Sequence, residues 1–524
     1  MKNIFHIYFL WISICILSAC SKVIDLQPES NVSVDNFYRN YTEVRTALTG
    51  VYNGLQKPLE TEWMLTELRS DISKQGSPGS TSVSNIELND LNTYLQNSSH
   101  PRVYDYWFYT YKNIRSANYV LRSLGVRYQE GATTFATEPT AVMDEEQRQR
   151  LAGEALFIRA YHYFNLTRLF GGVFILTEPQ TPADLKKINR SSIADCFKFI
   201  EADLKAAIEW LPIQTYDKQP EADRGRVTLW AAKALLAKLY LTMDKKTDAL
   251  SLLNDIIDRS GHALLASFED VFSINNEMNR EILFAVRYKA GGLGLGNFMA
   301  NAFAPLNSGS AIVNGNGSGL NYPTLHLESR YIVPNTGFKD ERKSVTIGRY
   351  NTLSYVQKFI SQVMTRNDAE NDFPVIRYSD VLLMKAEALG YSQESVDIIN
   401  SIRKRAGAGV YPGSGNFSAA FYLYPDSGPE AITDSNFLDK LLLERRLEFA
   451  FENHRYFDLV RTGHFESAMD TYYEAEYDQH YRRFRPPLEL DDLKKNIRIR
   501  PLLPIPQREI DTNNEIQIIQ NPGY

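Results

Sequence analysis

The chain has 524 residues and a mass of 59.9 kDa, a size that predicts two or three closely packed units rather than one simple core. Apolar residues make up 44% and charged residues 23%, which is typical of a globular chain and excludes a disordered one. The formal net charge is −6, so no basic excess is present to neutralise a phosphate backbone, and we expect no nucleic-acid partner.

The first twenty residues have the pattern of a bacterial signal peptide. Lys2 precedes an apolar run from Ile4 to Leu17, which is shorter than the ~20 residues that a membrane-spanning helix needs. The run ends in LSAC, which resembles the lipobox, whose cysteine thiol receives diacylglycerol. We therefore expect residues 1–19 to be removed, Cys20 to be lipidated, and residues 20–36 to form a tether that anchors the chain to a membrane. The alternative is an ordinary signal peptide followed by a chance cysteine.

Long helices dominate the rest of the chain in the sequence pattern. Helical periodicity predicts helices over 37–57, 59–72, 103–124, 144–170, 192–211, 227–243, 246–259 and 436–460. A strand is predicted over 281–289, and long loops over 75–101, 290–335 and 407–436. The helix around 227–243 is apolar nearly all round, which predicts that it is buried between others.

Two helix pairs are similar to tetratricopeptide repeats. With Tyr240 at the repeat's tyrosine position, Ala237, Ala249 and Leu253 fall on the matching small and large positions. Residues 381–405 form a second, shorter copy. The alternative is any antiparallel helix hairpin with small residues at its contact.

Five blocks resemble the signatures of the SusD/RagB family of nutrient-binding outer-membrane lipoproteins. They are GEALFIRAYHYFNLTRLFGGV at 153–173, FPVIRYSDVLLMKAEAL at 373–389, INSIRKRAGA at 399–408, LLLERRLEFAFENHRYFDLVRTG at 441–463 and LLPIPQREIDTN with the final QNPGY at 502–524. The blocks keep the family order. The chain departs from the family pattern at Lys385, where an aromatic residue is more usual, and in a longer insert at 408–436.

The resemblance implies a mainly α fold, in which a tetratricopeptide-like helix-pair scaffold packs against an irregular, loop-rich half with few short strands. It implies an N-terminal region over 37–280 and a C-terminal region over 281–524 that together form one compact body. It also implies a partner, a SusC-like TonB-dependent outer-membrane transporter, with the tetratricopeptide side facing the barrel. The location implied is the cell outer membrane, lipid-anchored and surface-exposed.

Ligand contacts are expected on the variable loops, because binding residues concentrate on loops that a rigid scaffold positions. Sugars need aromatic faces against their C–H faces, and Asp, Asn or Arg side chains to bind their hydroxyls. The candidate ligand-binding residues are Trp63, Arg69, Asp71, Asn85 and Tyr94 around the first loop, and Phe298 and Tyr322 in the second. The resemblance implies that an aspartate near the position of Asp71 lies in the binding site.

Three functional hypotheses follow. The first is a non-catalytic protein that binds an oligosaccharide, or in a variant a peptide, for uptake. The second is a surface glycoside hydrolase, which requires two carboxylates ~5–10 Å apart in a cleft. The third is a tetratricopeptide scaffold that binds only protein. The sequence has no Gly-x-Ser-x-Gly elbow, no P-loop Gly-Lys and no His-x-x-x-His spacing, so we expect no enzyme activity, no cofactor and no metal.

Overall fold

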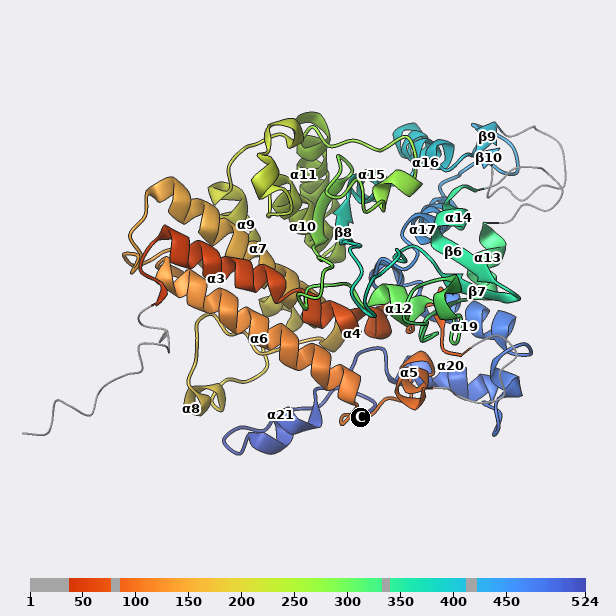
Figure 1. Ribbon diagram of the computed structural model, residues 1–524, viewed down its shortest axis with the longest axis horizontal. Helices are drawn as coiled ribbons and strands as arrows, with labels where there is room; N and C mark the ends of the chain where they lie inside the picture. The colour runs from red at the N-terminus through yellow and green to blue at the C-terminus, as the bar shows by residue number, and fades with distance from the viewer. Residues whose placement is uncertain (1–36, 77–84, 332–339, 411–421) are drawn as a thin grey trace, which may run out of the picture.

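The computed structural model describes residues 37–76, 85–331, 340–410 and 422–524 (Figure 1). The predicted signal peptide, Cys20 and the tether lie outside these residues. In the part of the chain that is described, no helix is long and apolar enough to cross a membrane.

Long helices build one half of the molecule, at the left of Figure 1. They are α3 (Tyr41–Asn53), α4 (Gln56–Thr66), α6 (Pro101–Ser123), α7 (Glu145–Phe170), α9 (Ile193–Trp210), α10 (Leu229–Thr242) and α11 (Lys246–Arg259). Helix α7 begins with a capping box between Asp144 and Gln147 and ends at Gly171, whose φ of 74° only glycine adopts readily. It is buried along most of its length because α6 and α9 pack on it.

The helix pairs have the expected tetratricopeptide-like arrangement. Helices α10 and α11 form one hairpin, α15 (Tyr378–Leu389) and α16 (Gln393–Arg405) form another, and α11 packs on α15 so that the pairs stack. Ala237, Ala249 and Leu253 are fully buried and Tyr240 is nearly so. The mainly helical, tetratricopeptide-like prediction is confirmed.

The other half consists of short elements joined by irregular segments. Its antiparallel pairs are β1 (Ser73–Lys74) with β5 (Tyr322–Pro323), β4 (Ile282–Val286) with β8 (Phe373–Arg377), and β6 (Ile347–Tyr350) with β7 (Leu353–Val356). The hairpin of β2 (Val126–Gln129) and β3 (Ala132–Phe135) packs on α6 and α9 and so belongs to the helical half. The last pair of the loop-rich half, β9 (Gly409–Val410) with β10 (Tyr422–Leu423), is parallel. Its helices are α12 (Met299–Phe303), α13 (Leu325–Arg330), α14 (Arg342–Thr346), α17 (Phe437–Glu448), α18 (Arg455–Arg461), α19 (Phe465–Glu476) and α20 (Leu490–Ile499). Three more short helices, α5 (Ile86–Asn92), α8 (Pro182–Leu185) and α21 (Gln507–Thr512), lie at the periphery.

Two predicted segments differ from the structure. The predicted helix over 436–460 is two helices, α17 and α18, because Phe451 and Asn453 adopt positive φ values of 69° and 63°. The Lys358 ammonium donates to the carbonyl of Ala450 at 2.9 Å, so a side chain binds a carbonyl that a continuous helix would have used. The predicted loop over 75–101 contains α5, whose N-cap is Asn85. The strand predicted over 281–289 is confirmed as β4, and all of its residues are buried.

One apolar core joins the two halves. It runs from Val44 in α3 to Ile518 near the C-terminus and includes β4 and β8. The loop-rich half is therefore packed on the helices rather than attached by a linker.

Candidate functional site

Pairing of β1 with β5 brings the two loops with predicted ligand contacts side by side. Ser73 pairs with Pro323 and Lys74 with Tyr322, although about 250 residues separate them in the chain. The Ser73 hydroxyl donates to Asn321 Oδ1 at 2.7 Å. We call residues 71–76 and 319–324 the seam. Long-range pairing of this kind gives the loops a fixed base from which to present side chains.

Three of the candidate residues are part of the core. Trp63 is 1% exposed and packs edge-on against Phe303, with ring centroids 5.0 Å apart. Arg69 is fully buried between the rings of Tyr94 and Tyr456, at 4.7 and 4.9 Å from their centroids. The Tyr94 hydroxyl donates to the Arg69 carbonyl at 2.5 Å. This placement corrects the expectation of ligand contact for Trp63, Arg69 and Tyr94, because no face of these side chains is left for a ligand.

Two more candidates are buried at the seam itself. Asp71 is 1% exposed, and both of its carboxylate oxygens accept hydrogen bonds from Arg455, at 2.8 and 2.9 Å. Burial alone would raise the pKa of Asp71, but Arg446 and Arg455 outweigh it and hold the pKa well below its usual range. Tyr322 is 3% exposed. Its ring therefore supports the seam and does not offer a stacking face.

Asn85 and Phe298 keep part of their surface. Asn85 accepts a hydrogen bond from the Leu88 amide at 3.0 Å as the N-cap of α5. Phe298 is half-buried and packs on the main core. Their roles as ligand contacts stay predictions.

Exposed side chains border the seam. They belong to the predicted loop over 290–335 and to residues 363–367. Leu306 is 52% exposed and Met364 is 92% exposed. Arg366 is exposed and donates to the Gly315 carbonyl and to Ser318 Oγ, both at 2.6 Å. We call Leu306, Met364 and Arg366 the rim. It combines apolar contact surface with a charged hydrogen-bond donor.

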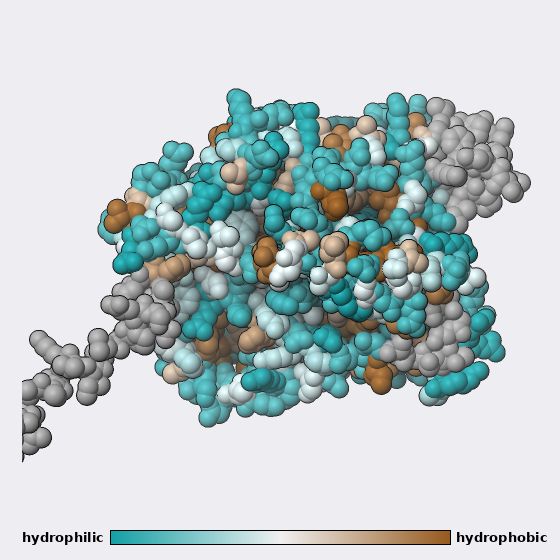
Figure 2. Space-filling view, viewed as in Figure 1, coloured by the Kyte–Doolittle hydropathy of each residue, from teal (hydrophilic) through white to brown (hydrophobic). Residues whose placement is uncertain are grey.

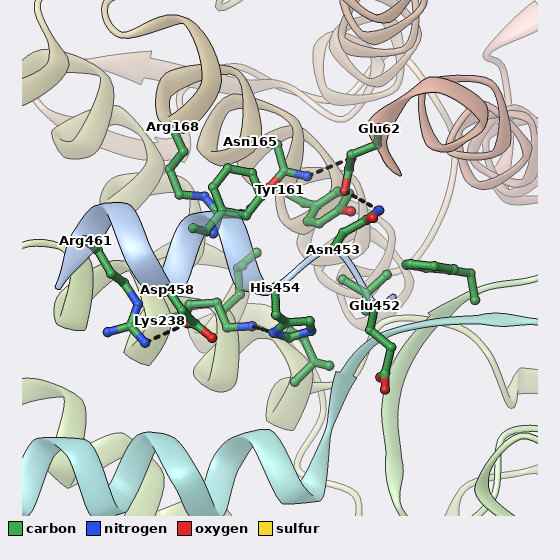
Figure 3. Close-up of a pocket in the computed structure, with 15 residues that line it drawn as sticks. Glu62, Tyr161, Asn165, Arg168, Lys238, Glu452, Asn453, His454, Asp458 and Arg461 are labelled. Atoms are coloured by element: carbon green, nitrogen blue, oxygen red, sulfur yellow. Dashed lines mark hydrogen bonds and ion pairs between the residues drawn. The ribbon is translucent and has the colours of Figure 1, made fainter. Parts of the chain in front are cut away.

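A small cavity lies deep between the two halves (Figure 3). Its volume of about 40 Å³ has room for about one water molecule. Asn165 and Asn453 point toward Glu62 and donate to its carboxylate at 3.1 and 3.3 Å (Figure 3). Burial raises the pKa of Glu62 and lowers that of Arg168 to about 10. The cavity is too small for a sugar, so these polar groups join the halves structurally.

His454 lines the same cavity and has a structural environment. Burial, followed by the nearby Lys238 ammonium, holds the pKa of His454 well below its usual value. Its ring stacks on Phe449 with centroids 4.8 Å apart. A neutral imidazole that is enclosed in this way is suited to a structural role.

A much larger groove runs along α6. It has a volume of about 580 Å³ and lies between α6, residues 174–188 and the segment around α21. Phe108 is 45% exposed and lines the groove with Tyr111, Phe174 and Leu185. Figure 2 shows hydrophobic residues in the recess beside α6, toward the lower left. We call this space the α6 groove. Its size is within the range of small-molecule and peptide sites.

The α6 groove also carries cations. Lys112 and Arg115 are exposed, and among the described residues neither forms an ion pair with a carboxylate. Arg115 instead donates to the Tyr119 hydroxyl at 3.1 Å. Sequence reasoning treated this segment only as a helix. The available signal was the recurrence of Phe108, Lys112, Arg115 and Tyr119 at helical spacing, which places an aromatic and basic stripe on the solvent side.

The described residues contain no group of three or more His, Cys, Asp or Glu side chains that could hold a metal ion. The elements together define a mainly helical protein in which stacked helix pairs support an irregular, loop-rich half.

Comparison with known proteins identifies the family. A model of the SusD family matches residues 337–524, and a second, SusD-like model described as "Starch-binding associating with outer membrane" matches residues 23–241. SusD-like protein P25 of Formosa agariphila is 25% identical over 94% of each chain. A solved laminarin-binding SusD-like protein is 26% identical, with a TM-score of 0.70 over 93% of this chain and 100% of its own. Surface glycan-binding protein A of Bacteroides thetaiotaomicron, solved with laminarihexaose, has a TM-score of 0.69 over 92% of this chain and 99% of its own at 19% identity, which shows a common fold. The chain belongs to the SusD/RagB family.

Proposed function

We propose that this protein is an outer-membrane lipoprotein that binds an oligosaccharide at the cell surface and passes it to a SusC-like TonB-dependent transporter. The observation that carries the proposal is the 26% identity to a laminarin-binding SusD-like protein over nearly the whole length of both chains. The lipobox ending at Cys20 supports the lipid anchor.

The seam and its rim are the proposed glycan site. Loops far apart in sequence meet there on a base fixed by strand pairing, and Arg366 offers donors to sugar hydroxyls. Asn85 and Phe298 keep partial exposure beside these loops and are proposed as additional contacts.

The α6 groove is the proposed contact with the transporter. It belongs to the helical half, whereas α13, α14 and β6 of the loop-rich half lie toward the other end of the long axis (Figure 1). An exposed aromatic ring flanked by cations without carboxylate partners is typical of protein interfaces, where aromatic residues and arginine are enriched.

Binding without catalysis is supported by the acids nearest the seam. Asp71 is paired with Arg455, and Glu476 is paired with Lys74 at 2.5 Å, with both members of the second pair buried. A glycosidase needs one carboxyl group poised as an acid and another accessible as a base or nucleophile. Carboxylates neutralised by buried cations are suited to neither task.

The test is calorimetric titration of the purified protein with laminarin, starch and a peptide mixture. The double variant Arg366→Ala/Leu306→Ala should lower glycan affinity about tenfold or more, because residues that anchor a ligand typically contribute over ~1 kcal/mol. The matched groove variant Phe108→Ala/Lys112→Ala should leave glycan affinity unchanged and reduce co-purification of the transporter.

Each contrary result identifies one alternative. Binding of peptides but of no glycan would favour the peptide-uptake variant. Release of reducing sugar by the purified protein would favour the hydrolase. Loss of glycan binding in the groove variant would move the glycan site to the helical half, and binding of neither glycan nor peptide by the parent protein would favour a scaffold that binds only protein.

A further inference from the structure

A second cavity is lined in part by Asp71. Its volume is about 300 Å³, and residues from α13, α17, α18 and α19 line it. Its charged and titratable lining residues are Asp71, His326, Arg330, Asp439, Arg446, Arg455 and His464. We call this space the arginine pocket. Apart from Asp71, which lies in the seam, none of these residues belongs to the proposed glycan site or to the transporter contact.

Asp71 and Arg455 satisfy one another within the pocket. Arg455 Nε and Nη2 donate to the two carboxylate oxygens of Asp71, and its Nη1 donates to the Leu442 carbonyl at 3.1 Å. This bidentate geometry is the strongest that a guanidinium and a carboxylate form. The pair is therefore electrically neutral and has little capacity left for other partners.

Arg446 lacks an equivalent partner. Its side chain is only 3% exposed, and its Nη2 donates to the Asp71 carbonyl at 2.7 Å. Its Nε lies 3.3 Å from Asp71 Oδ2, but without hydrogen-bond geometry. The remaining contact is with His326, whose Nδ1 lies 3.4 Å from both Nη atoms. Arg446 is thus a buried cation whose donors outnumber its acceptors.

His326 cannot accept from both of its neighbours. Arg330 Nη2 lies 3.1 Å from Nε2, while Arg446 lies against Nδ1. A neutral imidazole has one acceptor nitrogen and one N–H, and a protonated imidazole has no acceptor. In either state at least one guanidinium N–H faces another N–H. The cluster is therefore short of an acceptor.

The charge count points the same way. Among the described residues that line the pocket, the three guanidinium groups of Arg330, Arg446 and Arg455 are accompanied by two carboxylates, of Asp71 and Asp439. The Asp439 side chain is 73% exposed and lies 3.7 Å from His464 Nε2. Burial, followed by Arg446, lowers the pKa of His326 to about 4, and burial lowers the pKa of Arg446 to about 10. Burial is the main cause of both shifts, and the neighbouring guanidinium groups lower both pKa values further, whereas Asp71 opposes them.

We propose that the arginine pocket binds an oxyanion group, a carboxylate or a sulfate ester, carried by an acidic saccharide. Such a group supplies the missing acceptors and the missing negative charge, and its geometry matches the planar guanidinium. A volume of about 300 Å³ is at the small end of ligand sites, which suits one charged sugar unit rather than a long chain. That the oxyanion is carried by a saccharide rests on the proposed function. That the pocket binds an oxyanion does not depend on it.

The test follows the His326 ring by NMR, with its signals assigned by comparison with His326→Gln. The purified protein is titrated with sodium sulfate, glucuronate and neutral glucose at constant ionic strength set with chloride. Sulfate and glucuronate should shift the His326 signals saturably and raise the His326 pKa by about one unit or more, because a bound anion favours the imidazolium. Glucose should produce no shift.

Two variants separate a specific site from general charge. Arg330→Gln removes an exposed guanidinium without opening the core, and it should weaken anion binding about tenfold, the usual effect of losing one charged hydrogen bond. Arg482→Gln is the matched control, because Arg482 is also exposed and its one ion pair in the described structure is with the exposed Asp478. It should leave anion binding unchanged.

The outcomes separate this inference from the proposed function. An unmoved His326 signal, or equal effects of the two arginine variants, would overturn the oxyanion site even if neutral glycans bind. If the His326 signals shifted with sulfate but not with glucuronate or an acidic oligosaccharide, the pocket would bind an anion that no saccharide carries. Anion binding in a protein that binds no glycan would support the pocket and overturn the proposed function.

Discussion

The two halves of this protein are held together in different ways. In the helical half, α10 buries nearly all of its side chains among apolar neighbours. This half also contains a fully buried ion pair, which Arg159 of α7 forms with Asp203 of α9. In the loop-rich half, buried cations and acids form a connected lattice. Its members are Arg342, Lys358, Arg377, Arg403, Arg405, Glu281, Asp340, Glu444, Glu448 and Glu452.

Backbone hydrogen bonding explains the difference. A helix satisfies its own amides and carbonyls, but an irregular segment buried in a protein must find other partners for them. Side chains supply these partners in the loop-rich half. Arg403 donates to the Tyr422 carbonyl at 2.8 Å, and Lys358 donates to the Ala450 carbonyl at 2.9 Å. Each such cation then needs a buried acid, so the lattice is a consequence of irregular backbone.

The largest expected effect comes from removing an acid at the centre of the lattice. Glu448 accepts hydrogen bonds from Arg342, Arg377 and Arg405, so Glu448→Ala leaves three buried guanidinium groups short of a partner. Loss of one member of a buried ion pair typically costs about 3–5 kcal/mol. We expect a decrease in the free energy of unfolding at that scale, measured by urea denaturation.

Two controls make the comparison between halves sharp. Leu204→Ala empties a fully buried position on α9 and should cost about 2–5 kcal/mol through lost packing. Glu474→Ala removes an exposed acid that pairs with Lys494 and should have little effect. If Glu448→Ala cost no more than Glu474→Ala, the lattice would be dispensable and the contrast between the halves would fail.

Local patterns predicted the helices well. The periodicity over 246–259 coincides with α11, and the interval 144–170 differs from α7 by one residue at its start. Apolar spacing and capping residues act within one or two turns, so a single sequence contains the information. The break between α17 and α18 was not predictable in this way, because Lys358 and Glu67 stabilise it from remote parts of the chain.

The candidate site was harder to predict because burial is set by distant residues. Arg69 was selected as a polar side chain near a loop, but it donates to the carbonyls of Arg500 and Pro501, more than 400 positions away. Residue type and proximity to a loop do not distinguish an arginine that binds a ligand from one that binds buried carbonyls. The α6 groove was missed for the same reason, since one of its walls comes from the segment around α21.

An effect that is smaller within each pH unit tests the contact between the halves. Glu67 is buried, and its described contact is a hydrogen bond accepted from the Asn453 amide, with no ion pair. Burial raises the pKa of Glu67 to about 8. The folded protein therefore holds a proton that the unfolded chain releases above a pKa of ~4.3. The contribution of Glu67 to the free energy of unfolding is complete below pH ~4.3 and is lost as the pH rises toward 8. The loss is about 1.4 kcal/mol for each pH unit over which the folded state binds one proton more than the unfolded state.

Urea denaturation at several pH values between 5 and 8 measures the slope of the free energy of unfolding against pH. Glu67→Gln should reduce it, because a glutamine cannot ionise. Asp372→Asn is the matched variant, since burial raises the pKa of Asp372 to about 7. Asp71 and Asp458 have lowered pKa values, so their stabilisation is lost only at more acidic pH and does not contribute here. An unchanged slope in Glu67→Gln would show that Glu67 is ionised in the folded protein.

The smallest expected effect concerns Asn85, which is the N-cap of α5 and a proposed glycan contact. Two variants separate these roles. As the N-cap of α5 it can be replaced by serine with little loss, whereas Asn85→Ala should cost about 1 kcal/mol in unfolding free energy. A sugar hydroxyl held by the amide group would be lost in both variants, because serine is too short to reach the same position. Weaker glycan binding in Asn85→Ser at unchanged stability would therefore assign Asn85 to the glycan site. Equal affinity in Asn85→Ser and the parent protein would leave it as a cap, and the glycan contacts would then lie with the rim.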